Sequence, residues 1–458
     1  MREKGQILDI VADYVLVASF KEMLSGVRDA IWGCMAYNFT CAFAGSQLPW
    51  SLAACTVSDQ GGGPATIWTS EKRTTVTDAA FANAALGQST VNEDYHLPSL
   101  THPGSVTFAS LISIAEMLHS SGAKVLEAAV VAYDVIGKIG CALLTDEFRS
   151  KGFRPTGVFG PIGCAAGCAK LMGLNHEKTR NAMALACNCS SSLREWAYAG
   201  TSDVYFHNAF AAAAGVKCAL LAKEGISAPA SMLEGKAGLI QSHSGLSAIK
   251  RLEGEIAKFG TTYEVEHTFF KPYPTCGAVS HIAQIALKIF QENKPDPNRI
   301  ARIVVGTHKH GKNNPGCDNP GPYWGIGHAQ MSNQYAVASA LVFGEVTLDH
   351  YINYQDPLIN RLTSLTEVVI DPECERVYPA QKKGWIKVFL TDGKCIEKSQ
   401  TDLDLVVTPK DHSTIMDKLR IQANKVLGDK RASEFLHLVE KFEEIEDMSL
   451  LFTGGVLA

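Results

Sequence analysis

Residues 160–169 read Gly160-Pro-Ile-Gly-Cys-Ala-Ala-Gly-Cys-Ala169, with small side chains recurring at three- and four-residue spacing. A similar pattern returns in Phe210-Ala-Ala-Ala-Ala-Gly-Val216. Small residues at this spacing share one face of a helix and let two helix backbones approach closely. The two stretches therefore predict tightly packed helices inside a crowded bundle.

Helical patterning continues on both sides of these stretches, over residues 1 to about 265. Apolar segments with a helical period alternate there with short turns rich in glycine, asparagine, serine and proline. The clearest helices are expected over Val106–Ser120, Ala123–Leu144, Gly160–Leu174, His176–Ser191 and Asn208–Glu224. The uncharged stretch Ala30–Ser58 could span a bilayer by length, but Asn38 and Pro49 interrupt it, which favours a buried helix followed by a loop.

The pattern changes after about residue 268, where short strands with a period of two begin. Strands are expected at Ala301–His308, Glu367–Ile370, Trp385–Leu390 and Lys394–Lys398, the last two joined as a hairpin by Thr391-Asp-Gly393. Helices are expected at Ala278–Asn293, Gln334–Phe343, Ser413–Leu427 and Ala432–Glu444. This order predicts a mainly α protein: a large all-helical domain (residues 1–268 plus 400–458) with an inserted smaller α+β lid domain (residues 269–399).

Composition and charge limit the classes of partner. The 458 residues are 46% hydrophobic and 19% charged, and 42 Lys and Arg against 47 Asp and Glu give a net charge of −5 without a basic cluster. We therefore expect no nucleic-acid partner. Asp9 and Asp13 interrupt the apolar N-terminal stretch, so no signal peptide and no membrane partner are predicted. Thirteen cysteines without zinc-knuckle pairs indicate reduced thiols and a cytoplasmic location.

Motifs for nucleotides and metals are missing from the sequence. Gly61-Gly-Gly-Pro64 lacks the lysine of a P-loop, no Gly-x-Gly-x-x-Gly opens a βαβ unit, and no Gly-x-Ser-x-Gly marks an α/β-hydrolase. His308 and His310 share one face of an expected strand, but no third ligand stands at a telling spacing. We expect no cofactor and no metal.

The first segment that suggests chemistry runs from Asn92 to Gly104 and contains Glu93, Asp94, His96 and His102 ahead of an apolar helix. Acids beside histidines suit proton transfer, because each group tunes the pKa of the other. Acidic residues ahead of a helix also act as caps, so this pattern alone leaves both interpretations open.

Two further segments each present a cation. Arg154, in Gly152-Phe-Arg-Pro-Thr-Gly157, lies just upstream of a helix that we expect Pro161 to begin. A guanidinium at such a place suits a carboxylate, although a surface arginine gives the same pattern. Lys271 lies in Phe269-Phe-Lys-Pro-Tyr-Pro-Thr-Cys276, where the helical pattern of the first part of the chain changes to the strand pattern of the second. A lysine at such a junction suits either a cleft or a linker.

Taken together and in this order, these segments resemble the MmgE/PrpD family, which includes 2-methylcitrate dehydratase, cis-aconitate decarboxylase and iminodisuccinate epimerase. The motifs that carry the resemblance cover nearly the whole chain: Thr101-His-Pro103, Gly152-Phe-Arg-Pro-Thr-Gly-Val-Phe-Gly160, Gly200 to Ala212 with His207, Lys271-Pro-Tyr-Pro274 followed by His281, and Ser332-Asn-Gln-Tyr-Ala336. The resemblance implies an all-helical domain with a smaller α+β lid, a homodimer, an active site between the two domains, and catalysis on small carboxylates without metal or organic cofactor.

Residue by residue, the resemblance implies catalytic roles for His102, Lys271 and Tyr335. Asp94 matches an acidic position of the family and is expected to orient His102, as is His96, although Tyr95 and His96 depart from the family's Asp-Asp-Thr. Arg154 is assigned to substrate binding, and so are His207 and Cys276, which lie within matching segments.

One departure concerns charge. Better-known members of the family carry an active-site lysine where this chain has Val204, and they often carry histidine where it has Arg154. We expect Arg154 to replace part of the missing charge. The predicted activity is that of a 2-methylcitrate dehydratase-like lyase, which transfers a proton at the carbon α to a carboxylate of a di- or tricarboxylate. Epimerisation, decarboxylation and carboxylate binding without catalysis are the alternatives.

Overall fold

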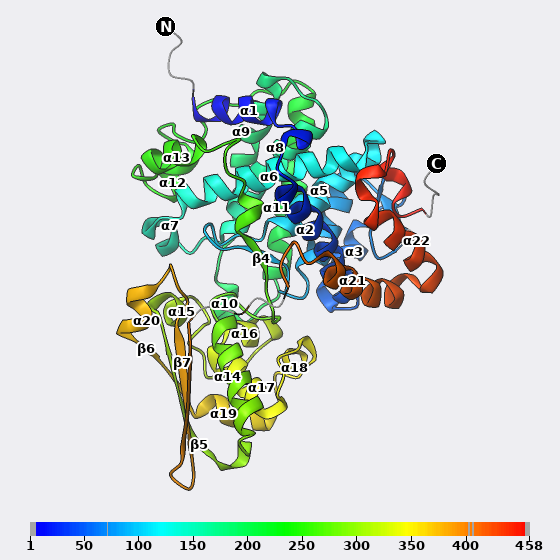
Figure 1. Ribbon diagram of the computed structural model, residues 1–458. Helices are drawn as coiled ribbons and strands as arrows, with labels where there is room; N and C mark the ends of the chain where they lie inside the picture. The colour runs from blue at the N-terminus through cyan, green and yellow to red at the C-terminus, as the bar shows by residue number, and fades with distance from the viewer. Residues whose placement is uncertain (1–5, 71, 402–403, 405–406, 454–458) are drawn as a thin grey trace. The chain divides into compact units, whose positions relative to one another are not determined.

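Helices form most of the chain in the computed structural model, which describes residues 6–70, 72–401, 404 and 407–453 (Figure 1). This confirms the mainly α prediction. The chain divides into two compact units. Unit 1 comprises Met1–Leu193, Tyr205–Phe270 and Val407–Ala458, and unit 2 comprises Arg194–Val204 and Lys271–Val406.

Unit 1 is a bundle of helices, and their positions agree closely with the apolar periodicity of the sequence. Its helices are α1 (Ile7–Val17), α2 (Ser25–Ala44), α3 (Pro49–Ser58), α4 (Val76–Gln88), α5 (Pro103–Leu118), α6 (Gly122–Leu143), α7 (Asp146–Ser150), α8 (Pro155–Leu171), α9 (His176–Cys187), α11 (Val204–Lys223, its first residue in unit 2), α12 (Leu239–His243), α13 (Ala248–Ile256), α21 (His412–Leu427) and α22 (Asp429–Glu440). Helix α5 is buried along almost its whole length because it is apolar all round.

The small residues of the opening stretch do permit close helix packing. A Cβ atom at Gly163 of α8 would lie 2.7 Å from the carbonyl oxygen of Ala132 in α6. A Cβ atom at Gly215 of α11 would lie 2.4 Å from the Cβ atom of Cys164 in α8. Both distances are shorter than normal van der Waals contacts, so only glycine allows these helices to approach so closely.

Two helix predictions in unit 1 need correction. Helix α8 begins at Pro155, directly after Arg154, and Pro161 lies inside it. Proline fits the first helical turn, where its missing N–H has no intrahelical partner, and Pro155 takes that position. The segment after α2 is helix α3, not a loop, and it begins in the same way with Pro49.

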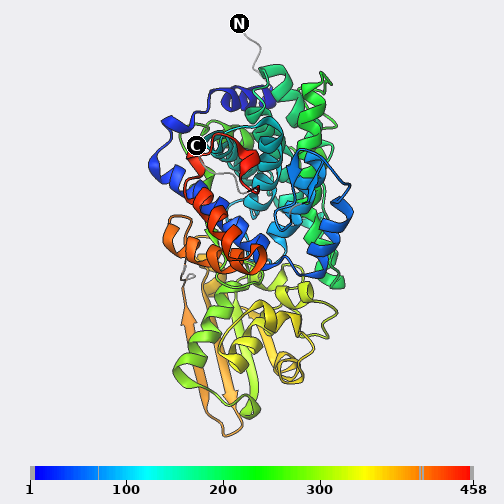
Figure 2. The ribbon, with the colours of Figure 1, turned by 90° about the vertical axis from the view of Figure 1, so that its right-hand side faces the viewer.

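The C-terminal helices of unit 1 pack against α2, as Figure 2 also shows. The indole N–H of Trp32 in α2 donates to the carbonyl oxygen of Val439 in α22 at 2.9 Å. The first and last thirds of the chain therefore share one core.

Unit 2 has a four-stranded sheet in the order β6-β5-β7-β8. Strand β5 (Ile300–Thr307) is parallel to β6 (Thr366–Ile370) and antiparallel to β7 (Gly384–Leu390), which pairs with β8 (Cys395–Gln400) in the predicted hairpin. The remaining helices are α10 (Trp196–Ala199), α14 (Ser280–Asn293), α15 (Lys309–Asn313), α16 (Ile326–Met331), α17 (Asn333–Phe343), α18 (Leu348–Ile352), α19 (Pro357–Ser364) and α20 (Pro372–Val377). Figure 1 shows α14 beside this sheet.

His308 and His310 do not share a strand face, contrary to the expectation. Strand β5 ends at Thr307, and His308 caps α15, where its Nδ1 atom accepts the N–H of Gly311 at 3.0 Å. The imidazole serves as a local backbone acceptor, a role that a strand pattern does not predict.

A short two-stranded sheet in unit 1 positions the first chemical segment. Strand β3 (Asp94–His96) pairs with β4 (Thr268–Phe270), so that Asp94 lies opposite Phe270 and His96 opposite Thr268. Lys271 is the next residue of the chain after β4.

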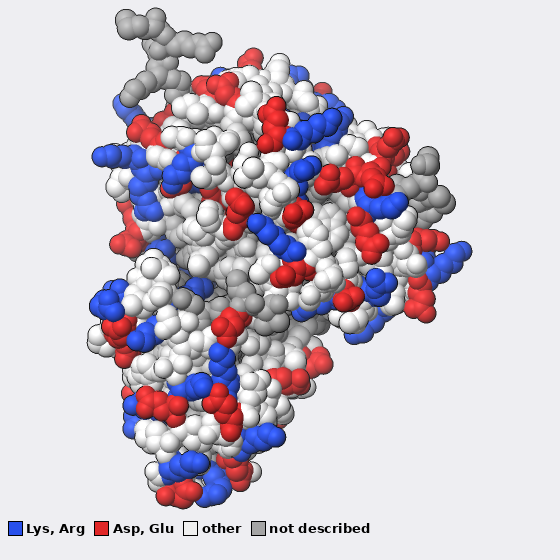
Figure 3. Space-filling view, in the orientation of Figure 1, with Lys and Arg blue, Asp and Glu red and all other residues white. Residues whose placement is uncertain are grey.

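One described helix, α11, is long and apolar enough to cross a membrane, but 61% of its apolar window is buried inside the protein. The core helix of a soluble protein shows the same pattern. The face drawn in Figure 3 carries Lys and Arg interspersed with Asp and Glu on both units.

Candidate functional site

His102 precedes helix α5 in unit 1 and is held on one side of its ring. Its Nδ1 atom lies 2.8 Å from the backbone carbonyl oxygen of Asp94 and 3.4 Å from Oε1 of Glu93. Its backbone N–H donates to Oγ1 of Thr156 at 3.0 Å. The side chain is 14% exposed, and the contacts to Nδ1 and to the backbone N–H orient the imidazole.

Asp94 is fixed by the turn between β3 and α5. Its carboxylate accepts the N–H of Gly104 at 3.0 Å and the hydroxyl of Tyr133 at 2.8 Å. A Cβ atom at residue 104 would lie 2.7 Å from Oδ1 of Asp94, so glycine is required for this approach. Asp94 therefore contacts the His102 ring through its main chain, while its carboxylate stabilises the turn.

Arg154 lies at the start of helix α8 and is buried, with 8% exposure. Its backbone N–H donates to the carbonyl oxygen of Ser192 at 3.0 Å, and its guanidinium Nη1 donates to Oδ1 of Asn208 at 2.7 Å. The side-chain amide of Asn208 donates to Oγ of Ser105 at 2.6 Å. The amide oxygen of Asn208 is neutral, so this bond positions the guanidinium without adding a negative charge.

A chain of hydrogen bonds joins Arg154 to His102 within unit 1. It runs from Arg154 through Asn208 to Ser105, whose hydroxyl donates to the carbonyl oxygen of His102 at 3.4 Å. The structure thus brings together one cation and one acid–base group that lie 52 positions apart in the chain, 154 against 102. His207, assigned to substrate binding, precedes Asn208 in α11 and is 7% exposed.

Sequence reasoning missed Asn208, which is fully buried within an alanine-rich helix. The sequence feature that could have indicated Asn208 is the pair of polar residues His207 and Asn208 in an otherwise apolar stretch. A buried amide needs hydrogen-bond partners, so such a position indicates a polar contact with another element.

His96 belongs to a second, fully buried network. Its Nδ1 atom lies 2.6 Å from Oγ of Ser99, and its Nε2 atom lies 3.0 Å from Oε2 of Glu264. The ammonium of Lys138 binds Oε1 of Glu264 at 2.6 Å. Both ring nitrogens of His96 are thus directed to Ser99 and Glu264, and its role in orienting His102 stays a prediction.

The charges of this network follow from burial and pairing. Burial lowers the pKa of His96, so the ring is neutral near pH 7. Burial raises the pKa of Glu264, but hydrogen bonds and positive charge, with Lys138 as the cation, outweigh this effect and lower that pKa to about 2. Glu264 is therefore an anion paired with Lys138, and Nε2 of His96 lies beside its other carboxylate oxygen.

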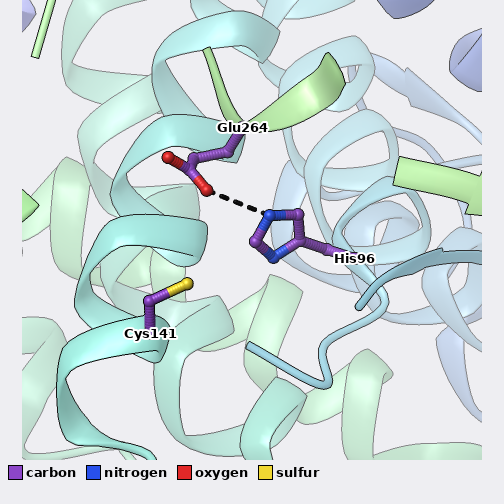
Figure 4. A group of neighbouring side chains, drawn as sticks. All are labelled: His96, Cys141 and Glu264. Carbon is purple, nitrogen blue, oxygen red and sulfur yellow. Dashed lines mark ion pairs between the residues drawn. The ribbon is translucent and has the colours of Figure 1, made fainter. Parts of the chain in front are cut away.

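Cys141 adds a third metal-ligating side chain to this place (Figure 4). The ligand atoms of His96, Cys141 and Glu264 lie within 4.8 Å of one another. Lys138 already occupies one oxygen of Glu264, and its positive charge opposes a metal cation at this place. Burial raises the pKa of the Cys141 thiol to about 12, so the thiol is protonated near pH 7. The expectation of metal independence stays a prediction.

Unit 2 contains the candidate residues that follow β4. Lys271 is 2% exposed, and its positive charge acts on Cys276 together with that of Arg194. A hydrogen bond from the Cys317 thiol outweighs burial and lowers the pKa of Cys276 to about 6, with these two cations adding to the effect. The assignment of Cys276 to substrate binding stays a prediction.

Arg194 is a cation that sequence reasoning missed. Its Nη1 atom donates to Oδ1 of Asn314 at 2.8 Å, and Nδ2 of Asn314 lies 3.3 Å from the Cys317 sulfur. Arg194 belongs to the short segment Arg194–Val204 that joins unit 2 from the middle of the helical region. Its only local signal is an isolated arginine after Cys189-Ser-Ser-Ser-Leu193.

Tyr335 lies in helix α17 and is fully buried. Its hydroxyl donates to the carbonyl oxygen of His350 at 2.7 Å, and burial raises its pKa well above the ordinary value of a phenol. The phenol is neutral and could donate to a substrate only after breaking this bond. Its catalytic role stays a prediction.

Comparison with known proteins places the whole set of motifs in one family. Residues 9–252 match the MmgE/PrpD N-terminal domain, and residues 273–444 match the MmgE/PrpD C-terminal domain. The chain is 26% identical over 443 residues to a cis-aconitate decarboxylase of Aspergillus terreus, covering 90% of this chain and 88% of the relative.

Two further relatives show a similar extent of likeness. A cis-aconitate decarboxylase-like protein of Aspergillus oryzae is 26% identical over 445 residues, with 90% of each chain covered. Human cis-aconitate decarboxylase is 26% identical over 410 residues, covering 85% of this chain and 81% of the relative. Both family domains match in order and together span most of the described fold, and the chain therefore belongs to the MmgE/PrpD family.

Proposed function

We propose that this protein is a lyase that acts on a small di- or tricarboxylate without a metal or organic cofactor. The observation that carries the proposal is the hydrogen-bonded chain from the Arg154 guanidinium through Asn208 and Ser105 to His102. It supplies one group that binds a carboxylate and one that moves a proton, held in a fixed relation to each other. The relatives named cis-aconitate decarboxylase support the same class of substrate.

The proposed roles follow from charge and geometry. Arg154 binds a substrate carboxylate, since the planar fork of its guanidinium matches a carboxylate and the bond to Asn208 holds that guanidinium in place. His102 moves a proton at the carbon α to a carboxylate through Nε2, because its Nδ1 atom is held by the carbonyl oxygen of Asp94. Lys271 stabilises the negative charge that develops on the substrate.

Decarboxylation is the first reaction to test, because it is the reaction in the names of the relatives. A C–C bond of the substrate would break, CO₂ would leave, and the electron pair would remain on the carbon skeleton, delocalised into a neighbouring carboxylate. His102, entering this reaction as the imidazolium with a proton on each ring nitrogen, would then donate its Nε2 proton to carbon and return to the neutral ring with its proton on Nδ1. Arg154 and Lys271 would lower the energy of the charged intermediate by electrostatic stabilisation.

Dehydration is the second candidate reaction, and the same groups would serve it. His102 would take the proton from the carbon α to a carboxylate, and the hydroxyl on the neighbouring carbon would leave as water after protonation. Better-known members of the family carry an active-site lysine where this chain has Val204, which is 3% exposed and carries no charge. Because this chain lacks that lysine, both reactions should be tested.

The test is product analysis by NMR with cis-aconitate, citrate and 2-methylcitrate in D₂O. We expect a new product or incorporation of solvent deuterium with wild-type protein, and loss of both with His102→Ala. Lys271→Ala should lower kcat by about 10²-fold or more, the range for loss of one preorganised electrostatic donor. Lys312→Ala is a control, because this lysine of unit 2 lies in helix α15 and pairs with Asp318. Tight binding of an acid without turnover or deuterium uptake would contradict the proposal and favour a carboxylate-binding protein.

A further inference from the structure

Two cysteines of unit 1 lie side by side at the surface. Cys189 follows the end of helix α9, and Cys218 lies in helix α11, with 4.0 Å between their sulfur atoms. Cys189 is exposed, and Cys218 is 5% exposed behind it. The sulfurs need to approach by about 2 Å to reach the S–S bond length of about 2.05 Å, a movement within the reach of side-chain rotation.

The environment of Cys189 suits oxidation. Cys189 and Cys395 are the exposed thiols among the thirteen cysteines, all of which lie in described residues. The hydrogen bond from the Cys218 thiol outweighs burial and lowers the pKa of Cys189 to about 6, and the same bond raises the pKa of Cys218. A thiolate at the surface is the species that reacts with peroxides, and a thiol beside it can resolve the product.

The two cysteines lie on two elements, and each element forms a hydrogen bond with Arg154. On one side, the segment of residues 188–193 accepts the Arg154 backbone N–H at the carbonyl oxygen of Ser192, at 3.0 Å. On the other side, helix α11 provides Asn208, which accepts the guanidinium at 2.7 Å. A covalent link between Cys189 and Cys218 would therefore tie together the backbone support and the side-chain support of one arginine.

We propose that Cys189 and Cys218 form a reversible disulfide under oxidation by a hydroperoxide, and that this bond restricts the segment that supports Arg154. The Cys189 sulfur attacks one peroxide oxygen, an S–O bond forms and the O–O bond breaks, which leaves a sulfenic acid and, with hydrogen peroxide as the oxidant, one water. The Cys218 sulfur then attacks the Cys189 sulfur, the S–S bond forms, and the hydroxyl leaves as a second water with the Cys218 proton. The two thiols lose two electrons and two protons in total, and the peroxide takes up both to give two waters.

The test is intact mass and peptide mapping of the full chain before and after treatment with hydrogen peroxide, followed by dithiothreitol. We expect a mass loss of about 2 Da for one disulfide, a peptide pair linked through Cys189 and Cys218, and full reversal by the reductant. Cys189→Ser and Cys218→Ser should each abolish the linked pair. Cys395→Ser is the matched control, since it removes the other exposed thiol and should leave the linked pair unchanged.

Peptide mapping separates this disulfide from one between Cys276 and Cys317 of unit 2, which would give a different linked pair. Detection of that pair alone, or oxidation of Cys189 to a sulfinic acid without a link, would overturn the proposal.

The second readout is hydrogen–deuterium exchange, which needs no substrate. In the oxidised protein we expect slower exchange of amides in residues 188–193 and at Arg154, because a disulfide limits the opening that exposes them. Cys218→Ser under the same treatment should show no slowing. A disulfide that forms without this slowing would overturn the link to Arg154. Neither measurement depends on turnover, so failure of the proposed lyase activity would be recognised separately.

Discussion

The Nδ1 atom of His102 lies 2.8 Å from the backbone carbonyl oxygen of Asp94, while the Asp94 carboxylate binds Gly104 and Tyr133. A carbonyl oxygen only accepts hydrogen bonds, so this contact places a proton on Nδ1 of the neutral ring. In this tautomer the basic lone pair of the ring is on Nε2. Orientation by a main-chain atom also means that the side chain of Asp94 acts on His102 through the turn.

His102→Gln should lower kcat by about 10²-fold or more, because the amide keeps hydrogen-bonding capacity but cannot move a proton. Steady-state kinetics with the acid that wild type converts would measure this. His176→Gln provides the control, since this histidine of unit 1 pairs with Asp13 at the surface and should leave kcat unchanged. A kcat near the wild-type value for His102→Gln would remove His102 from the proposed mechanism.

Arg154→Lys should act mostly through KM. Lysine keeps the positive charge but loses the planar fork that binds a carboxylate through two hydrogen bonds. A hydrogen bond to a charged group contributes about 1.5–3 kcal/mol, so KM should rise about tenfold or more with a small change in kcat. Arg180→Lys is the control, because this arginine of α9 pairs with Asp9. Equal KM values for both variants would contradict substrate binding by Arg154.

Glu116 predicts a pH dependence of stability that is separate from activity. Burial raises the pKa of this carboxyl to about 7, although the backbone N–H and hydroxyl of Thr66 donate to it at 2.9 and 2.6 Å. Because the pKa in the folded state exceeds that of the unfolded chain, the stability associated with this group is fully present below about pH 4.3 and is lost as pH rises through 7.

Glu116→Gln removes this ionisation while keeping the shape of the side chain. The difference in unfolding free energy between the variant and wild type should therefore shift in favour of the variant as pH rises from 5 to 8, by about 3 kcal/mol at most. Urea unfolding at several pH values would measure it. Glu434→Gln is the control, a carboxyl of α22 that is exposed. A difference that is independent of pH would show that Glu116 does not titrate in this range.

Activity should be unaffected by EDTA. The group formed by His96, Cys141 and Glu264 is already organised by Lys138, whose ammonium lies 2.6 Å from Glu264. Activity assays before and after chelation, with elemental analysis of the purified protein, would check this. Stoichiometric metal whose removal abolishes activity would contradict the prediction, and loss of that metal in Cys141→Ser would assign it to this group.

We expect a homodimer formed through helices of unit 1. Helix α11 exposes Phe210 and Leu221, which lie eleven positions apart on one face, 63% and 41% exposed. Burial of such side chains against a second copy is favourable. Light scattering at micromolar concentration should give twice the chain mass of 49.4 kDa. Phe210→Asp should shift the mass toward one chain, and Leu246→Asp, which replaces an equally exposed leucine of unit 1, should not. A monomeric wild type would contradict the expectation.

The amino-acid sequence by itself determined the helical class of the fold, the position of helices such as α5 and α6, and the β7–β8 hairpin. Those features depend on local periodicity and turn chemistry, and Thr391-Asp-Gly393 is sufficient to indicate a hairpin. The motifs around His102, Arg154 and Lys271 also indicated the family, since a motif is a property of the chain alone.

Tertiary structure decided which atoms of these residues meet. Asp94 contacts His102 through its carbonyl oxygen, and Arg154 bonds to Asn208, 54 residues away. Cys189 meets Cys218 only because the segment after α9 lies against helix α11. The physical reason is that a hydrogen bond needs two groups within about 3 Å in a narrow range of directions. Between segments far apart in the sequence, only the packing of whole helices fixes that distance.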